Sequence, residues 1–168
     1  VYGPGLQGFV MRKSHELVER DFGPDAYFAR VLEVGAGTGT HINSVRHRFD
    51  EYVMTDLHDE MLRRRHGERP GVVLRNEDAA RLSFEDESFD RVIAAHVLEH
   101  LYRPHEVLRE WWRVLKPGGV LSLGHIAVER NEPDVPLVQK GNGLPAVIRD
   151  GGPGLRSSRE DHVRVLQR

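Results

Sequence analysis

The chain has 168 residues, of which 39% are hydrophobic and 30% charged, as expected for one soluble globular domain. Its formal net charge of −2 gives no reason to expect a nucleic-acid partner, and the absence of cysteine excludes disulfides and cysteine-based zinc sites. Because no apolar stretch is long enough to cross a membrane and no signal peptide is visible, we expect a cytoplasmic protein without membrane association; a first residue of Val rather than Met also fits a fragment or a processed chain.

The chain is expected to begin with an irregular arm followed by a helix. Residues 1–9 are rich in the turn formers Gly and Pro. Residues 11–22 carry a few apolar positions in a polar remainder, which favours a helix, and Gly23 with Pro24 ends it.

A glycine-rich turn follows the first predicted strand. Residues 31–34 are mostly apolar and suit a buried strand, after which Gly35, Gly37 and Gly39 alternate with small residues and lead into a predicted helix over residues 39–48. Such a turn brings bare backbone N–H groups up to a ligand. The spacing is G-x-G-x-G rather than the G-x-G-x-x-G of dinucleotide folds.

Each of the next two predicted strands is followed by an acidic residue. The strand over residues 51–55 ends in Asp56, a position from which a carboxylate can hold ribose hydroxyls. A helix over residues 59–66 leads to a short strand at residues 72–74, and Asp78 comes shortly after it.

The second half of the core repeats the alternation of strand and helix. A strand over residues 89–95 ends before His96, and a helix over residues 104–115 starts with Pro at its first position. A tight turn at residues 117–119 then precedes a strand over residues 120–128. Alternating strands and helices predict a parallel, doubly wound sheet whose ligand loops meet at the carboxyl ends of the strands.

Five features in a fixed order carry a resemblance to a known family. They are the glycine turn, Asp56, the stretch 76–80, the stretch 89–100 and the sequence Leu-Lys-Pro-Gly-Gly at 115–119. As a set they resemble the class I S-adenosylmethionine-dependent methyltransferases, in particular the small-molecule branch with the "LKPGG" turn. The resemblance covers residues 28–126 and implies an α/β, mostly parallel Rossmann-like sheet in a single domain.

The resemblance also divides the chain into three parts. Residues 1–27 would form an arm and helix over the cofactor cleft, residues 28–128 the cofactor-binding core, and residues 129–168 a Gly- and Pro-rich loop with the start of an incomplete C-terminal part. Residues 161–166 look like the family's entry into the helix before strand six. The last two strands would then be missing, and the strand at 120–128 would keep an unpaired edge.

S-adenosylmethionine is the implied cofactor, and each of its parts has an implied partner. Asp56 would accept hydrogen bonds from the ribose, Leu57 would lie against the adenine, and Asp78 with the Ala79 N–H would bind the adenine edge. Glu33 would reach the methionine ammonium or brace the turn. The amino acid part would meet the backbone of Gly35, Ala36, Gly37 and Gly39. A helix cap at Asp56 and a turn former at Asp78 are the plain alternatives.

Two histidines are candidate catalytic residues. His96 and His125 would end or follow strands at the cleft, where either could act as a base or orient a substrate, and His96 could also touch the cofactor. Residues 96–100 fit H-x-x-E-H, but His96 closes a strand, so the zinc-protease pattern does not apply. Relatives that bind a divalent metal have Glu where His96 stands, and we expect no metal.

These features predict methyl transfer to an O, N or C nucleophile of a small molecule. The alternatives are a degenerate or truncated module that binds cofactor or a partner without catalysis, and a nicotinamide-dependent oxidoreductase, which the glycine spacing disfavours. The methyl acceptor and the oligomeric state are not predicted.

Overall fold

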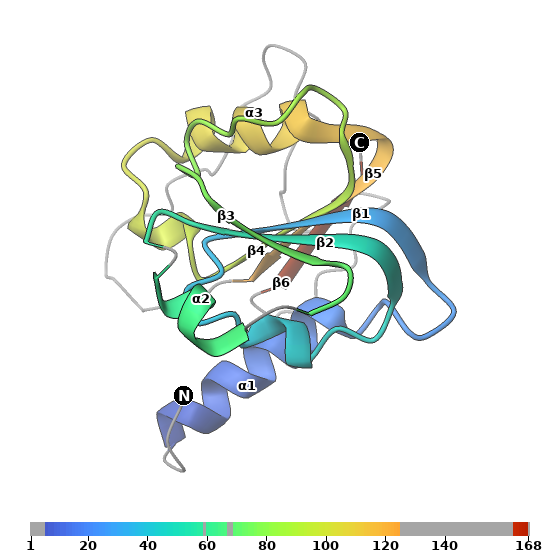
Figure 1. The fold of residues 1–168 in the computed structure, drawn as a ribbon, viewed down its shortest axis with the longest axis vertical. Helices are drawn as coiled ribbons and strands as arrows, with labels where there is room; N and C mark the ends of the chain where they lie inside the picture. The colour runs from blue at the N-terminus through green and yellow to red at the C-terminus, as the bar shows by residue number, and fades with distance from the viewer. Residues whose placement is uncertain (1–5, 59, 67–68, 125–162, 168) are drawn as a thin grey trace, which may run out of the picture.

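A six-stranded sheet forms the centre of the computed structural model, which describes residues 6–58, 60–66, 69–124 and 163–167. The strand order is β3-β2-β1-β4-β5-β6, so the order reverses beside β1, which pairs with both β2 and β4. All neighbours are parallel except β5 and β6, which confirms the predicted doubly wound sheet (Figure 1). The strands are β1 (Tyr27–Val34), β2 (Arg48–Asp56), β3 (Val72–Asn76), β4 (Phe89–Ala95), β5 (Leu115–Gly124) and β6 (Val163–Gln167).

Helices cover both faces of this sheet. Figure 1 shows α3 (Pro104–Val114) on one face, with α1 (Leu6–Glu19) and α2 (Glu60–His66) on the other. Strands buried on both faces must be apolar on both, which explains the continuous apolar runs of β1 and β4. Two hydrophobic clusters result, one beneath α3 and one on the opposite face, where Val18 of α1 is buried.

Helix α3 shows how its sequence specifies its place. Pro104 lies at its start, where no backbone N–H is needed. Its buried residues recur at helical spacing: Val107, Leu108, Trp111 and Val114. Trp111 is fully buried, and its indole N–H donates to the Ala79 carbonyl at 2.9 Å.

The helix predicted over residues 39–48 does not form. Only a 3-10 turn, η1 (His41–Asn43), follows the glycine turn, and β2 already begins at Arg48. The Thr40 carbonyl accepts bonds from both the backbone and the side-chain amide of Asn43, and the Ser44 N–H bonds His41 instead of continuing an α-helix from Thr40. Asn and Ser compete for the backbone in this way, and they disfavour helix interiors.

The chain end also differs from the prediction. Residues 163–167 form β6, antiparallel to β5, rather than the entry into a helix, with Val120 opposite Gln167 and Gly124 opposite Val163. The edge of β5 predicted to be unpaired is therefore paired along these residues. Val163, Val165 and Leu166 are β-branched or apolar residues that suit a strand, and pairing satisfies the exposed backbone groups of an edge.

Several boundaries move: β1 and β2 begin before the predicted residues 31 and 51, and residues 125–128 of the strand predicted over residues 120–128 lie outside the described residues. Helix α1 begins at Leu6, so the last residues of the predicted irregular arm are helical. The turn at residues 117–119 lies inside β5 rather than before it: Leu115 pairs with Phe89 and Val120 with Arg91, so the intervening residues form an irregularity in the strand. The predicted helix at 59–66 and the strand at 72–74 lie close to α2 and β3. Within the described residues, no helix is long and apolar enough to cross a membrane.

Candidate active site

The glycine turn after β1 requires glycine at three positions. Gly35, Gly37 and Gly39 have φ angles of 64°, 56° and 66°, in the left-handed region that other residues rarely adopt. The turn is tied to the sheet, because the Ala36 N–H donates to the Thr55 carbonyl at 2.8 Å. A Cβ at Gly35 would collide with Val97, whereas one at Gly37 would meet nothing within 4 Å. Open space therefore lies beside the middle of the turn.

Asp56 lies at the carboxyl end of β2 and contacts the glycine turn directly. One carboxylate oxygen accepts the Gly37 N–H at 2.8 Å, and the other accepts the His58 N–H at 2.9 Å. The carboxylate is thereby fixed in place, while each oxygen keeps a second lone pair for a ligand hydroxyl. The structure brings together the two features on which the nucleotide-binding prediction most depends.

An exposed apolar side chain follows Asp56. Leu57 is 57% exposed and leaves an apolar side chain at the surface next to Asp56. Its backbone carbonyl accepts the side-chain amide of Asn76 at 2.7 Å, and the Asp56 carbonyl accepts the Glu77 N–H. Sequence reasoning gave Asn76 no role; its signal is a polar residue at the carboxyl end of β3.

Asp78 and Ala79 lie in the turn after β3. Asp78 is exposed, and its carboxylate accepts the Ala80 N–H at 2.8 Å, as in an ordinary Asx turn. Ala79 is partly buried against the cluster beneath α3, and Trp111 holds its carbonyl. These contacts fix the backbone of the turn and leave the Asp78 carboxylate at the surface.

Glu33 is a buried brace rather than a surface group. It is 2% exposed, its carboxylate accepts the Tyr52 hydroxyl at 2.8 Å, and its carbonyl accepts the Thr55 hydroxyl at 3.0 Å. Burial and the Glu33 carboxylate raise the pKa of Tyr52 well above its ordinary value, so Tyr52 remains the donor. These contacts join Glu33 to β2, and the two roles predicted for Glu33, at the methionine ammonium or as a brace of the turn, stay predictions.

His96 follows β4 and has an unusual backbone. Its φ angle is 61°, and its N–H donates to the Gly124 carbonyl at 2.7 Å. Its ring nitrogen Nε2 lies 2.6 Å from the Ser14 hydroxyl of α1, and the His15 ring lies 5.7 Å away. Helix α1 therefore reaches the carboxyl end of β4. The sequence predicted an arm and helix over the cofactor cleft for residues 1–27, without a contact to His96. His125 lies outside the described residues.

A buried polar network joins α1 to the sheet, and sequence reasoning missed it. Arg91 is completely buried in β4 and donates to both carboxylate oxygens of Glu19, at 2.8 and 2.9 Å. His41 bonds Glu19 at 2.9 Å and His15 at 2.9 Å. The available signal was an Arg directly before the apolar run at residues 92–95 of a predicted buried strand, since a buried charge requires a partner.

The pKa values in this network follow from burial and pairing. Burial is the main cause that lowers the pKa of His15 to about 3, assisted by His41 and His96. Burial alone would raise the pKa of Glu19, but hydrogen bonds from His41 and Arg91, with the Arg91 charge, outweigh it and lower the pKa to about 2. Glu19 is therefore ionised and His15 neutral near pH 7.

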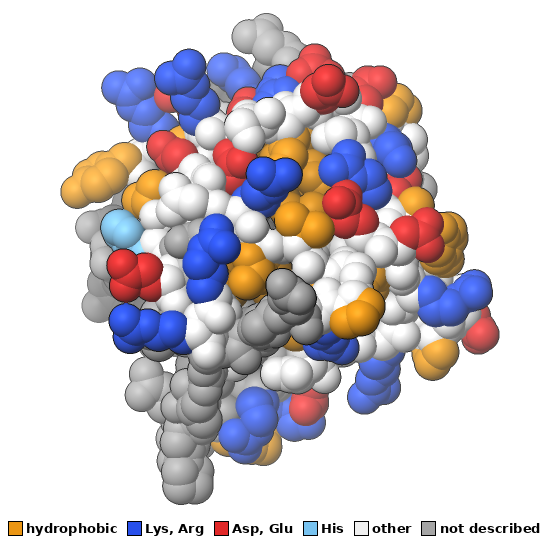
Figure 2. Space-filling model, in the orientation of Figure 1, with side chains coloured by type: hydrophobic (Ala, Val, Ile, Leu, Met, Phe, Trp, Pro, Cys, Tyr) orange, Lys and Arg blue, Asp and Glu red, His pale blue; other side chains and the backbone are white. Residues whose placement is uncertain are grey.

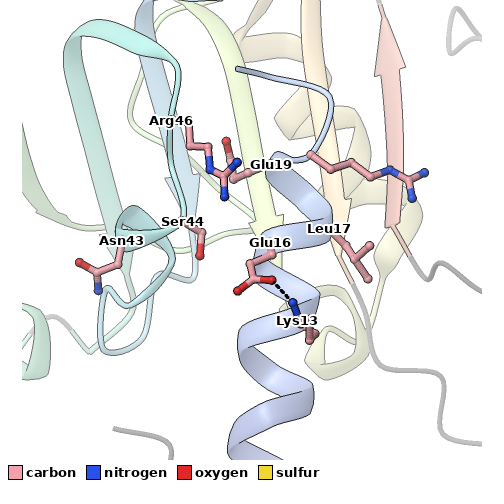
Figure 3. Close-up of a pocket in the computed structure, with 8 residues that line it drawn as sticks. Lys13, Glu16, Leu17, Glu19, Asn43, Ser44 and Arg46 are labelled. Carbon is pink, nitrogen blue, oxygen red and sulfur yellow. Dashed lines mark hydrogen bonds and ion pairs between the residues drawn. The ribbon is translucent and has the colours of Figure 1, made fainter. Parts of the chain in front are cut away.

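A cavity of about 420 Å³ lies between α1 and the segment after η1 (Figure 3). Glu19, Arg46 and Ser44 contribute to its wall, and Lys13 bonds Glu16 at 2.5 Å along α1. None of the predicted cofactor-binding or catalytic residues lines it, so we place the candidate site at the carboxyl ends of the strands. Within the described residues, no group of three His, Cys, Asp or Glu side chains is arranged to hold a metal ion.

Known proteins with similar sequences match the part of the chain that forms the sheet from β1 to β5. The family described as "methyltransferase domain" matches residues 32–123. A demethylmenaquinone methyltransferase from Clavibacter sepedonicus is 36% identical over 118 residues, which cover 68% of this chain and 46% of that protein. A phosphatidylethanolamine N-methyltransferase from Cereibacter sphaeroides is 36% identical over 107 residues, covering 60% and 53%. The chain spans about half the length of these curated relatives.

Solved structures agree with the fold. A putative methyltransferase from Bacillus halodurans superposes with a TM-score of 0.56 at 26% identity, covering 67% of this chain and 50% of that one. The methyltransferase CalH, solved in complex with SAH, superposes with a TM-score of 0.54 at 25% identity, covering 70% and 38%. Since the matched family extends over more than half of the residues, from β1 to β5, the chain belongs to the methyltransferase-domain family.

Proposed function

We propose that this chain binds S-adenosylmethionine and transfers its methyl group to an O, N or C nucleophile of a small molecule. The observation that carries the proposal is the hydrogen bond from the Gly37 N–H to Asp56, which fixes a ribose-binding carboxylate beside an open glycine turn. Family membership supports the reaction, because the relatives described above are named methyltransferases.

The residues at the carboxyl ends of the strands fit such a cofactor. Asp56 has lone pairs for the ribose hydroxyls, Leu57 offers an apolar face to the adenine, and the Asp78 carboxylate is exposed for the adenine amine. The space beside Gly37 leaves room for the amino acid part. When bound, the cofactor supplies an activated methyl group and its leaving group. The protein holds the methyl acceptor in line and excludes water.

His96 is the described residue that we assign to the methyl acceptor. It ends β4 beside the glycine turn, because Val97, the next residue, packs against Gly35. His125 is proposed for the same region on its sequence position. A histidine acts as a base here only where the acceptor must lose a proton.

A small-molecule acceptor is proposed rather than a nucleic acid. Two relatives are named for a quinone precursor and a phospholipid. On the face drawn in Figure 2, basic and acidic side chains are interspersed instead of forming one basic patch.

We propose the cytoplasm as the location of the protein, and we propose no membrane partner. The division of the chain into residues 1–27, 28–128 and 129–168 stays a prediction.

Calorimetric titration with S-adenosylhomocysteine tests cofactor binding, with NAD and ATP as controls. Saturable binding of S-adenosylhomocysteine alone is expected. Asp56→Ala should weaken it at least tenfold, because hydrogen bonds to a charged group contribute about 1.5–3 kcal/mol. The matched control is Asp50→Ala, which removes an exposed carboxylate from the opposite end of β2 and should leave the affinity unchanged. Equal affinity of Asp56→Ala and the wild type would contradict the proposed site.

The non-catalytic module makes a different prediction. In its cofactor-binding form it requires S-adenosylhomocysteine binding without methyl transfer to any acceptor in a panel of phenols, amines and quinols, and in its partner-binding form the folded chain does not bind S-adenosylhomocysteine. The edge of β5 that was predicted to be unpaired is paired with β6.

A further inference from the structure

The backbone of His96 is strained at a defined place. A non-glycine residue at a φ of 61° is strained and persists only where the surroundings hold it. Here the Gly124 carbonyl holds the backbone N–H, and Ser14 of α1, 82 residues away in sequence, holds the ring. The ring of His96 is therefore oriented by a helix that lies outside its own strand and loop.

The single proton of Ser14 decides the direction of this contact. The Ser14 hydroxyl lies 2.8 Å from the Met11 carbonyl, which can only accept a hydrogen bond. The hydroxyl proton is used there, so the Ser14 oxygen must accept from His96. The hydrogen on His96 therefore resides on Nε2, and in the neutral ring Nδ1 carries the lone pair.

We propose that Ser14 is a positioning residue that fixes His96 in the Nε2–H tautomer and thereby makes Nδ1 its accepting nitrogen. The proton transfer that this inference assigns to His96 rests on the proposed function. A methyl acceptor would then meet His96 through an O–H or N–H group. On transfer, that bond breaks, its electron pair stays on the acceptor atom, and the proton forms a new N–H bond at Nδ1. Oxygen and nitrogen acceptors are thus favoured over carbon acceptors without such a group.

The surroundings keep this arrangement constant. The titratable side chain that faces His96 from α1 is His15, whose pKa is lowered to about 3, chiefly by burial, so it places no charge beside the ring near pH 7. Glu19 at the end of α1 is clamped by Arg91 of β4, which fixes the helix against the sheet. Nδ1 of His96 lies beneath the surface, so an acceptor that bonds to it must displace the atoms covering it.

Two-bond ¹H–¹⁵N NMR of the histidine rings at pH 8 tests the tautomer without any cofactor or activity. The His96 signals are identified by their loss in His96→Asn, a replacement that tolerates a positive φ. The wild type should show protonated Nε2 and unprotonated Nδ1. Ser14→Ala should shift His96 to a mixture of tautomers, whereas Ser14→Thr, whose hydroxyl can also bond the carbonyl three residues earlier, should restore the wild-type pattern.

The outcomes separate this inference from the proposed function. Ser88→Ala, which removes a hydroxyl bonded to the Glu85 carbonyl elsewhere, should leave the His96 signals unchanged. An Nδ1–H tautomer in the wild type, or a Ser14→Ala spectrum identical to the wild type, would overturn the role of Ser14. Failure of S-adenosylhomocysteine to bind any variant would instead overturn the proposed function and leave the tautomer result standing.

Discussion

At the residue scale, the glycine turn allows two costs of adding a side chain, backbone strain and overpacking, to be measured separately. Gly35 and Gly37 share a positive φ, but only at Gly35 would a Cβ collide with Val97. We therefore expect Gly37→Ala to lower the free energy of unfolding by about 1 kcal/mol through backbone strain alone. Gly35→Ala should add a further overpacking cost of about 1–3 kcal/mol.

Urea unfolding of the two variants measures these costs. The matched control is Gly23→Ala, where a Cβ meets nothing within 4 Å and φ lies outside the left-handed region, so stability should change by less than about 0.5 kcal/mol. An equal loss of stability in Gly35→Ala and Gly37→Ala would show that the contact with Val97 adds no overpacking cost at Gly35.

At the element scale, α1 depends on one buried ion pair. Glu19 is 2% exposed and Arg91 is completely buried, so removing one charge leaves the other without compensation. Glu19→Gln should lower the free energy of unfolding by about 3–5 kcal/mol, and Glu19→Gln with Arg91→Met should recover much of it. Glu16→Gln, which breaks only the exposed pair with Lys13, is the control and should cost less than about 1 kcal/mol. A loss in Glu19→Gln as small as in Glu16→Gln would contradict the dependence on this pair.

The same elements show what the sequence could predict. Apolar runs bounded by turn residues predicted β1 to β4 within a few positions, because strands buried in a parallel sheet must be apolar on both faces. The predicted topology also placed Asp56 and the glycine turn at the same edge of the sheet, where the Gly37 N–H donates to Asp56. These features depend on local patterns and on the handedness of the crossovers.

The rest depends on tertiary partners that no local pattern specifies. The helix after the glycine turn was lost to bonds from Asn43 to Thr40 and from Ser44 to His41, and β6 forms because β5 offers an edge. The partners of Arg91 come from α1 and β5, 72 and 31 positions away. Ser14 reached His96 in the same way, across 82 positions. His125 remains a prediction from sequence.

At the scale of the whole molecule, the buried network should make stability depend on pH. The folded pKa of His15 is lowered from 6.5 to about 3, so the unfolded chain binds more protons between these values. Burial lowers the pKa of His47 as well, which acts in the same direction. The contribution of His15 to stability is then complete above about pH 6.5 and falls as the pH decreases towards 3, by about 1.4 kcal/mol per pH unit. The lowered pKa of Glu19 extends the loss from pH 4.5 to about 2.

Urea unfolding at pH 7 and pH 5 measures this slope. His15 alone should make the wild type about 2 kcal/mol less stable at pH 5, since its unfolded form takes up a proton that the folded form excludes. His15→Gln removes that titration and should reduce the difference between the two pH values by about the same amount, whatever its effect at pH 7. His105→Gln, which changes an exposed histidine on α3, should retain the wild-type difference. If the wild type is equally stable at both pH values, burial in the folded protein does not lower the pKa of His15. In that case α1 is not packed against the sheet through a neutral histidine.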